Sequence, residues 1–208
     1  MRIGVIGSGL IGGTLARLLT RAGHEVMVSN SRGPETLAGL VGELGARATA
    51  GTPARAAAFG ELVIVAVPFG RYRELPAAEL AGRIVVDTNN YYPARDGELD
   101  ELDEGVSTSS ELLAAHLEGA RVVKAFNTVW YRRLRDEGRP RGAPGRLAVA
   151  LAGDDPDAKR TVAALVDEIG FDPVDTGGLA EGGRRQQPGS PIYDVALTAD
   201  QLRQRLDA

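Results

Sequence analysis

The chain has 208 residues, of which 43% are hydrophobic and 25% charged, and its formal net charge is −4. These values are typical of one globular α/β domain with a small appendage. The negative charge gives no electrostatic support for nucleic-acid binding, no apolar run approaches the ~18 residues of a membrane span, and the lack of cysteine excludes disulfides and thiolate chemistry. Because Met1 leads directly into a strand pattern, we expect no signal peptide and a cytoplasmic location.

Apolar strand-like segments alternate with helical patterns along the chain. Residues 3–6 predict a first strand, residues 11–22 an amphipathic helix that ends at Gly23, and residues 25–30 a second strand. Further strands are predicted at residues 62–67, 84–86, 122–123, 147–151 and 171–174. Thr108 with Glu111 forms a capping-box pattern for a helix through Leu117, and Asp155 with Pro156 begins a helix that ends at Gly170. This alternation predicts an α/β fold with a Rossmann-type doubly wound parallel sheet.

One stretch near the carboxyl end breaks the alternation. Residues 177–191 are rich in Gly, Pro, Gln and Arg, and they are too many for a routine connection. A short helix near residues 199–206 follows. We therefore expect a dinucleotide-binding domain over residues 1–176 and a C-terminal extension, residues 177–208, that packs near the site or across a dimer contact.

A glycine-rich turn follows the first strand. Its GxGxxG pattern is formed by Gly7, Ser8, Gly9, Leu10, Ile11 and Gly12. Because this turn lies between a strand and an amphipathic helix, it predicts a dinucleotide site with the pyrophosphate at the helix N-terminus. The alternative is a glycine-rich turn without a ligand.

The segment after the second strand predicts which dinucleotide binds. Asn30, Ser31 and Arg32 stand where a site that prefers NAD usually has a carboxylate. Arg32 can pair with a 2′-phosphate and stack on an adenine, and Asn30 and Ser31 can donate further hydrogen bonds. This pattern favours NADP(H) as the cofactor; the alternative for Arg32 is an exposed loop position.

The ends of the later strands carry the remaining candidates, because ligands of this fold bind beyond the carboxyl ends of the strands. Val67, Pro68 and Phe69 predict an apolar shelf for the nicotinamide, although Phe69 alone is also explained by packing. The predicted substrate contacts are Asn89, Asn90, Tyr91, Lys124, Asn127 and Thr128, with Ala125 on the cofactor side. The tyrosines Tyr91 and Tyr92 could instead cover the core, and the asparagines could simply belong to a turn.

Lys124 and Asn90 are the two candidates for a catalytic role. Lys124 interrupts an apolar strand, which is costly unless its amine finds a partner or a cavity. It could bind an anionic group or donate a proton, or its stem could snorkel to the sheet edge. Hydride transfer between flat rings needs mainly proximity and excluded water, so a dedicated acid or base is optional. His24 and His116 show no ligand pattern, so we expect no metal site.

Several of these motifs together resemble those of a known family. They are the glycine-rich turn, Ser31-Arg32, Ala66-Val67-Pro68, the run from Val122 to Thr128, the run from Ala152 to Asp155 and the run from Asp172 to Gly177. The chain resembles the NADP-dependent oxidoreductases that use coenzyme F420, a deazaflavin. The resemblance covers nearly the whole chain and implies direct hydride transfer between NADP(H) and a deazaflavin, in a homodimer.

Two other functions remain open. One is an NADPH-dependent reductase of another small carbonyl or imine acceptor. The other is a non-catalytic NADPH-binding regulator, which would lack a substrate cavity beside the nicotinamide. In each case we expect a small-molecule ligand, with no nucleic acid or membrane as partner.

Overall fold

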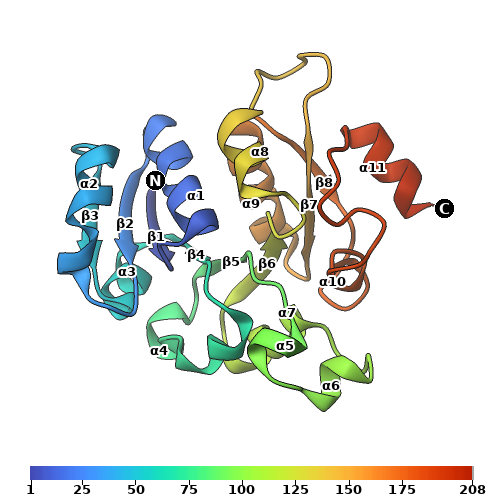
Figure 1. Ribbon diagram of the computed structural model, residues 1–208, viewed down its shortest axis with the longest axis horizontal. Coiled ribbons are helices and arrows are strands. Elements are labelled where there is room, and N and C mark those ends of the chain that lie inside the picture. Colours follow the sequence, from blue (N-terminus) through green and yellow to red (C-terminus); the bar gives the residue numbers. More distant parts are fainter. Residues whose placement is uncertain (208) are drawn as a thin grey trace.

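The computed structural model describes residues 1–207. Within these residues the strands form one eight-stranded sheet in the order β3-β2-β1-β4-β5-β6-β7-β8 (Figure 1). The strands are β1 (Arg2–Ile6), β2 (Glu25–Ser29), β3 (Ala48–Gly51), β4 (Leu62–Val65), β5 (Ile84–Asp87), β6 (Arg121–Ala125), β7 (Ala148–Gly153) and β8 (Asp172–Asp175). The strand order reverses beside β1, and there the carboxyl ends of β1 and β4 lie next to each other.

Helices connect the strands. The α-helices are α1 (Leu10–Arg21), α2 (Ala38–Leu44), α3 (Pro53–Phe59), α4 (Ala77–Leu80), α5 (Pro93–Asp96), α6 (Asp100–Asp103), α7 (Ser109–His116), α8 (Tyr131–Asp136), α9 (Pro156–Glu168), α10 (Glu181–Arg185) and α11 (Ala199–Leu206). Two 3₁₀ helices are η1 (Pro34–Leu37) and η2 (Phe69–Glu74). Among residues 1–207, none of the helices has both the length and the apolar character needed to cross a membrane.

The predicted Rossmann-type fold is confirmed. The first strand and helix lie within a residue of their predicted bounds, and Gly23 follows the helix with a φ of 96°. Thr108 and Glu111 form the predicted capping box, and the Asp155 side chain accepts hydrogen bonds from two backbone N–H groups of α9. The helix at residues 199–206 is also present as predicted.

The sheet departs from the predicted parallel arrangement at one pairing. Strand β7 runs antiparallel to β6, and β8 runs parallel to β7. All six residues of β7 are buried, so its sequence is a continuous apolar run. Such a run is typical of a central parallel strand, and it does not reveal the direction of the strand. The carboxyl ends of β7 and β8 therefore lie on the side of the sheet where β1, β4, β5 and β6 have their amino ends.

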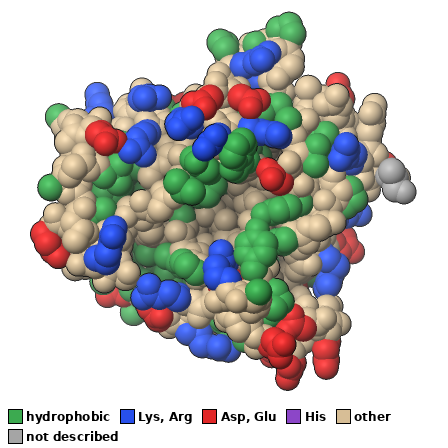
Figure 2. All heavy atoms as spheres, viewed as in Figure 1, with side chains coloured by type: hydrophobic (Ala, Val, Ile, Leu, Met, Phe, Trp, Pro, Cys, Tyr) green, Lys and Arg blue, Asp and Glu red, His purple; other side chains and the backbone are tan. Residues whose placement is uncertain are grey.

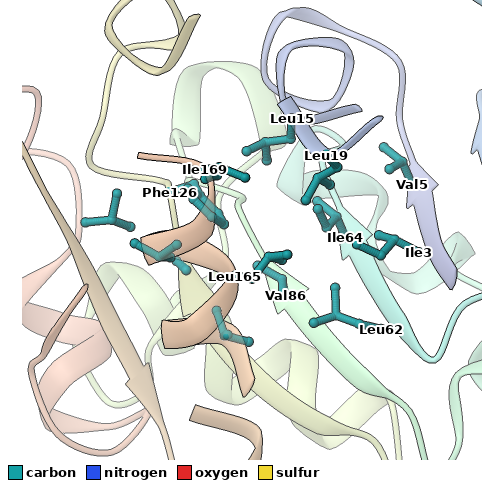
Figure 3. Packing of buried hydrophobic residues seen from close by; sticks show 14 of the residues in the cluster. Ile3, Val5, Leu15, Leu19, Leu62, Ile64, Val86, Phe126, Leu165 and Ile169 are labelled. Atoms are coloured by element: carbon teal, nitrogen blue, oxygen red, sulfur yellow. The ribbon is translucent and has the colours of Figure 1, made fainter. Parts of the chain in front are cut away.

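The core lies on both faces of the sheet. Because side chains alternate along a strand, Ile3, Val5 and Ile64 pack with α1 and α9 on one face (Figure 3). Ile6, Val63 and Val65 pack with α3 and α7 on the other face. A third, smaller cluster joins α11 to β7 and β8 through Leu197, Leu202 and Val174. The strands that end at the candidate site are therefore held rigidly from both sides.

Candidate functional site

Two adjoining cavities lie at the carboxyl ends of β1, β4, β5 and β6. The larger has a volume of about 450 Å³ and the smaller one of about 300 Å³. Both are lined by Gly9, Ala66, Val67 and Pro68, so they form one continuous groove. Figure 2 shows a hollow at the centre of this face, with hydrophobic side chains beside it and Lys and Arg side chains around it. We call the two parts the large and the small cavity.

The three glycines of the turn have different roles. Gly7 has a φ of +105°, and a Cβ at this position would collide with the Ala66 carbonyl oxygen. A Cβ at Gly12 would collide with the Gly7 carbonyl oxygen. A Cβ at Gly9 would meet no heavy atom of the described chain within 4 Å, because Gly9 faces the groove. Gly7 and Gly12 are therefore required by packing, whereas Gly9 leaves space where a ligand can approach the backbone.

The N-terminus of α1 opens onto the same groove. Gly9 is its N-cap and supplies no side-chain acceptor, and the first turn carries no acidic residue. The first N–H groups of a helix have no intrahelical partner, and the helix dipole adds a partial positive charge there. Because Ser8 lines the small cavity and Leu10 and Ile11 the large one, this helix end lies between them. These residues fit the pyrophosphate of a dinucleotide.

The small cavity contains the residues predicted to select the cofactor. Asn30, Ser31 and Arg32 line it. The Asn30 side chain accepts a hydrogen bond from the Arg32 N–H at 2.9 Å and donates one to Thr36 at 2.9 Å, so it shapes the loop. Within residues 1–207 the exposed Arg32 guanidinium forms no hydrogen bond or ion pair, which leaves it free to bind an anion.

Arg71 is a second cation of the small cavity, and the sequence patterns did not single it out. Its Nε donates hydrogen bonds to both carboxylate oxygens of Glu74 at 3.0 Å. The hydrogen bond from Arg71 lowers the pKa of Glu74, which therefore stays ionised. Both residues belong to η2, which directly follows Pro68. The position of Arg71 just after the end of β4 is the signal that could have identified it.

Amide side chains connect the strand ends on the floor of the large cavity. The Asn89 Oδ1 accepts a hydrogen bond from the Val67 N–H at 3.0 Å. Two hydrogen bonds join Asn90 and Asn127. The Asn90 Nδ2 donates to the Asn127 carbonyl at 2.9 Å, and the Asn127 Nδ2 donates to the Asn90 Oδ1 at 3.0 Å. The buried Asn89 Nδ2 has no hydrogen-bond partner in the described part of the chain. These residues and Thr128 line the cavity where polar ligand contacts were predicted.

Aromatic side chains form the walls of the large cavity. Tyr92, Trp130, Tyr131 and Tyr193 line it. Arg95 lies beside them, with its guanidinium carbon 4.9 Å from the centre of the Tyr92 ring and its Nη2 donating to the Asn90 carbonyl at 2.7 Å. Sequence reasoning missed Trp130, Arg95 and Tyr193, because each lies in a loop or a very short helix without periodicity. Tyr193 comes from the predicted C-terminal extension, whose last residue, Ala208, lies outside the described residues.

Three predicted contacts lie away from the cavity. Phe69 is fully buried and stacks on Tyr72 with ring centres 4.7 Å apart, so it is a packing residue and not a shelf for a nicotinamide. Ala125 is also fully buried, because its side chain faces the core from β6. The Tyr91 hydroxyl donates to Asp103 and to the Gly97 carbonyl, each at 3.0 Å, and so anchors the neighbouring loop. Of the two adjacent tyrosines, Tyr92 faces the cavity.

Lys124 is buried beneath the cavity and not exposed within it. Its Nζ donates hydrogen bonds to the Asn89 carbonyl and to the Ser110 hydroxyl, both at 3.0 Å, and lies 3.4 Å from an Asp87 carboxylate oxygen. With a side chain 1% exposed, it cannot contact a ligand in this arrangement. The prediction that Lys124 binds substrate or donates a proton is therefore wrong for this structure. Its cost of burial is offset by an internal partner.

The chain is similar to several known proteins. A family model described as NADP oxidoreductase coenzyme F420-dependent matches residues 2–91. The hypothetical protein SMa0349 of Sinorhizobium meliloti is 35% identical, with a TM-score of 0.82 and 95% of both chains covered. A protein of Arthrobacter sp. FB24 assigned as an F420-dependent NADP-reductase is 28% identical, with a TM-score of 0.76, 95% of this chain and 99% of that chain covered.

A longer relative is also found among curated proteins. The metalloreductase STEAP3 of Rattus norvegicus is 34% identical over 181 residues. These residues are 86% of this chain but 34% of that protein, so the chain spans about a third of its length. The resemblance found in the glycine-rich turn and the strand ends is confirmed by these matches. Residues 2–91 match the family described as NADP oxidoreductase coenzyme F420-dependent, and the likeness to these solved structures over 95% of the chain agrees with an NADP-dependent oxidoreductase.

Proposed function

We propose that the protein transfers a hydride between NADP(H) and the deazaflavin coenzyme F420. The observation that carries the proposal is the continuity of the groove: Gly9 and the N-terminus of α1 lie between a small cavity with a free cation and a large cavity with aromatic walls. A dinucleotide whose pyrophosphate binds at α1 has room for one end in each cavity.

The small cavity supports a preference for NADP(H). Arg32 is available for a 2′-phosphate, and Ser31 is exposed beside it. The carboxylate of Glu74 lies in the same cavity, but its charge is matched by Arg71. A ribose-binding carboxylate directly after β2, which is typical of NAD sites, is absent from the sequence. The charges therefore favour a cofactor with an additional phosphate.

The large cavity supports binding of a second, flat molecule. Bound NADPH supplies the hydride, and the chain supplies position and shelter from water. Tyr92, Tyr193 and Trp130 give flat apolar surfaces, and the free Asn89 Nδ2 gives a hydrogen-bond donor. A conjugated ring system with carbonyl groups matches both features. The family match supports a deazaflavin as that molecule.

The two alternative functions make different demands on this cavity. A reductase of a small carbonyl or imine would use the same polar floor with a smaller acceptor. A regulator that only senses NADPH needs no second cavity beside the nicotinamide end, and the large cavity argues against it. The activity in the name of the metalloreductase STEAP3 is not transferred to this chain, because only a third of that protein is covered. The homodimer and the cytoplasmic location stay predictions.

An acceptor panel tests the proposal. Purified protein is mixed with NADPH or NADH and, in turn, with coenzyme F420, a flavin, small ketones and a cyclic imine, and loss of the reduced nicotinamide is followed by absorbance. We expect oxidation of NADPH in the presence of coenzyme F420, and slower oxidation of NADH. Oxidation with the imine or ketones alone would favour the alternative reductase, and NADPH binding without any oxidation would favour the regulator.

A further inference from the structure

Two tyrosines from distant segments meet at the wall of the large cavity. Tyr92 is the N-cap residue of α5, and Tyr193 lies 101 residues later, between α10 and α11. Their hydroxyl oxygens are hydrogen-bonded to each other, and both residues line the cavity. Backbone bonds fix both segments: the Tyr92 N–H donates to Asp96 at 2.9 Å, and the N–H after Tyr193, that of Asp194, donates to the Thr128 carbonyl at 2.9 Å. The pair is therefore built into the fold.

One of the two hydroxyl protons of this tyrosine pair has no hydrogen-bond acceptor among residues 1–207. Each phenol carries one O–H, and the bond between the two oxygens uses one proton. The third neighbour, the Asn90 Nδ2 at 3.5 Å from the Tyr193 oxygen, can only donate. In either orientation, one hydroxyl proton has no acceptor within residues 1–207.

The surroundings favour Tyr92 as the residue with the free proton. The Tyr193 oxygen accepts from Asn90, and a hydroxyl that accepts a hydrogen bond becomes a better donor, so Tyr193 donates to Tyr92. Burial and the hydrogen bond to Tyr92 raise the pKa of Tyr193, in keeping with this orientation. The Arg95 guanidinium lies over the Tyr92 ring, with its carbon 4.9 Å from the ring centre, and it is ion-paired with Asp96 at 2.8 Å.

We propose that Tyr92 is the proton donor to the hydride acceptor and that Tyr193 is a positioning residue that holds the Tyr92 hydroxyl in place. This proposal rests on the proposed function and identifies the source of the proton that the acceptor takes up together with the hydride. A conjugated acceptor that gains a hydride places an electron pair on a ring nitrogen or oxygen, and that atom needs a proton. The Tyr92 O–H bond breaks, an N–H or O–H bond forms on the acceptor, and the Tyr92 phenolate regains a proton from water. The acceptor is reduced by two electrons and NADPH is oxidised to NADP⁺.

Three matched substitutions test the proposal, each removing one phenolic oxygen. Tyr92→Phe removes the proton donor and Tyr193→Phe its positioning partner. Tyr72→Phe is the control, because Tyr72 is buried against Phe69 and does not line either cavity. Turnover with coenzyme F420 and NADPH is measured over a range of pH, and NADPH affinity by calorimetry.

We expect Tyr92→Phe to slow turnover about 100-fold or more, as is typical for loss of a general acid. NADPH affinity should match that of the Tyr72→Phe control, because the cofactor phosphates bind elsewhere. The proposal predicts that the wild-type rate declines at alkaline pH, where the donor proton is lost, that this decline disappears in Tyr92→Phe, and that it shifts to a different pH in Tyr193→Phe. Turnover of Tyr92→Phe equal to that of the control would overturn the proposal.

A titration without cofactor tests the hydroxyl pair itself. Phenol ionisation is followed by ultraviolet absorbance in the ligand-free protein. One tyrosine should titrate late in the wild type, and in Tyr92→Phe the Tyr193 midpoint should fall because a hydrogen-bond partner is lost. An unchanged midpoint would mean that the pair does not form, which overturns the proposal. Wild-type protein that binds NADPH but does not oxidise it with coenzyme F420 would overturn both this proposal and the proposed function, whereas active wild type with an equally active Tyr92→Phe overturns this one alone.

Discussion

Arg32 is the residue that we expect to determine the preference for NADPH over NADH. Its guanidinium is exposed in the small cavity, where the proposed function places the 2′-phosphate of NADPH, so Arg32→Ala should remove a charge-assisted contact. Such contacts contribute about 1.5–3 kcal/mol, so NADPH affinity should fall by roughly 10- to 100-fold while NADH affinity stays unchanged. Calorimetric titration of both cofactors measures this. Arg21→Ala, at the other end of α1, is the control. Equal weakening of both cofactors would refute the assigned role.

Gly9 and Gly12 separate binding from folding. A side chain at Gly9 would extend into the groove without touching the described chain, so Gly9→Val should fold normally and lose NADPH binding. A side chain at Gly12 would collide with the Gly7 carbonyl, so Gly12→Val should unfold at lower temperature or fail to fold. Thermal unfolding and NADPH titration of both variants test this. A folded Gly9→Val protein with normal affinity would mean that the turn is not the phosphate site.

At the residue scale, the sequence predicts a site well where the contacts are local. The glycine-rich turn and Arg32 lie within one strand–helix–strand unit, and their spacing alone indicates their role. The burial of Lys124 depends on hydrogen bonds to Asp87 and Ser110, which belong to other elements. No local sequence pattern indicates these contacts. The same holds for Tyr193, which faces Tyr92 only because the chain returns to the cavity after α10.

At the scale of elements, an ion-pair network joins α9 to β8. The buried Arg146 donates hydrogen bonds to Asp167 at 2.8 Å and to Asp172 at 2.6 Å. Hydrogen bonds from Arg141 and Arg146 lower the pKa of Asp167. The folded state therefore binds fewer protons at this carboxylate than the unfolded chain, so its stabilising effect is present above the unfolded value of 3.8 and is lost as the pH falls through the lower folded value.

Asp167→Asn should consequently reduce the free energy of unfolding at neutral pH by about 1 kcal/mol. The difference from wild type should shrink as the pH is lowered below the unfolded pKa, because the wild-type carboxylate then loses its charge. Urea unfolding at neutral and at acidic pH measures both effects. Asp136→Asn is the matched control: Asp136 also pairs with an arginine, but its side chain is 54% exposed and the change should be small. A difference that grows toward acidic pH would contradict this assignment.

The sequence predicted the longer strands and the capped helices well. It did not predict the direction of the last strands or the presence of the shortest elements. The strands β1, β4, β5 and β6 stand out because they are apolar on both faces, and the capped helices because of their side-chain signals. Strand direction has no local signal, so β7 and β8 were expected to run parallel to the others. The short elements α2, α3 and β3 are rich in Ala and Gly, and their identity depends on packing: α3 contacts β1 and β2, β3 contacts β2, and α2 contacts β3 and α1.

At the scale of the whole molecule, the carboxyl-terminal segment supplies one wall of the groove. Residues 177–207 pack on β7 and β8 through Ile192, Leu197 and Leu202, and they bring Tyr193 and Asp194 to the large cavity. Figure 1 shows this part on the right, opposite the nucleotide-binding half at the left. The site thus combines an N-terminal half that fits the cofactor with a wall supplied from the end of the chain.

Transfer of a deuterium label tests the central claim most directly. NADPH carrying deuterium on one face of C4 is mixed with the protein and coenzyme F420, and the reduced acceptor is analysed by mass spectrometry and NMR. We expect NADPH labelled on one of the two faces to deliver its deuterium to the acceptor carbon without exchange with water, because the two rings meet in a sheltered cavity. Reduced acceptor that carries only solvent hydrogen with either label, or no reduction at all, would contradict it.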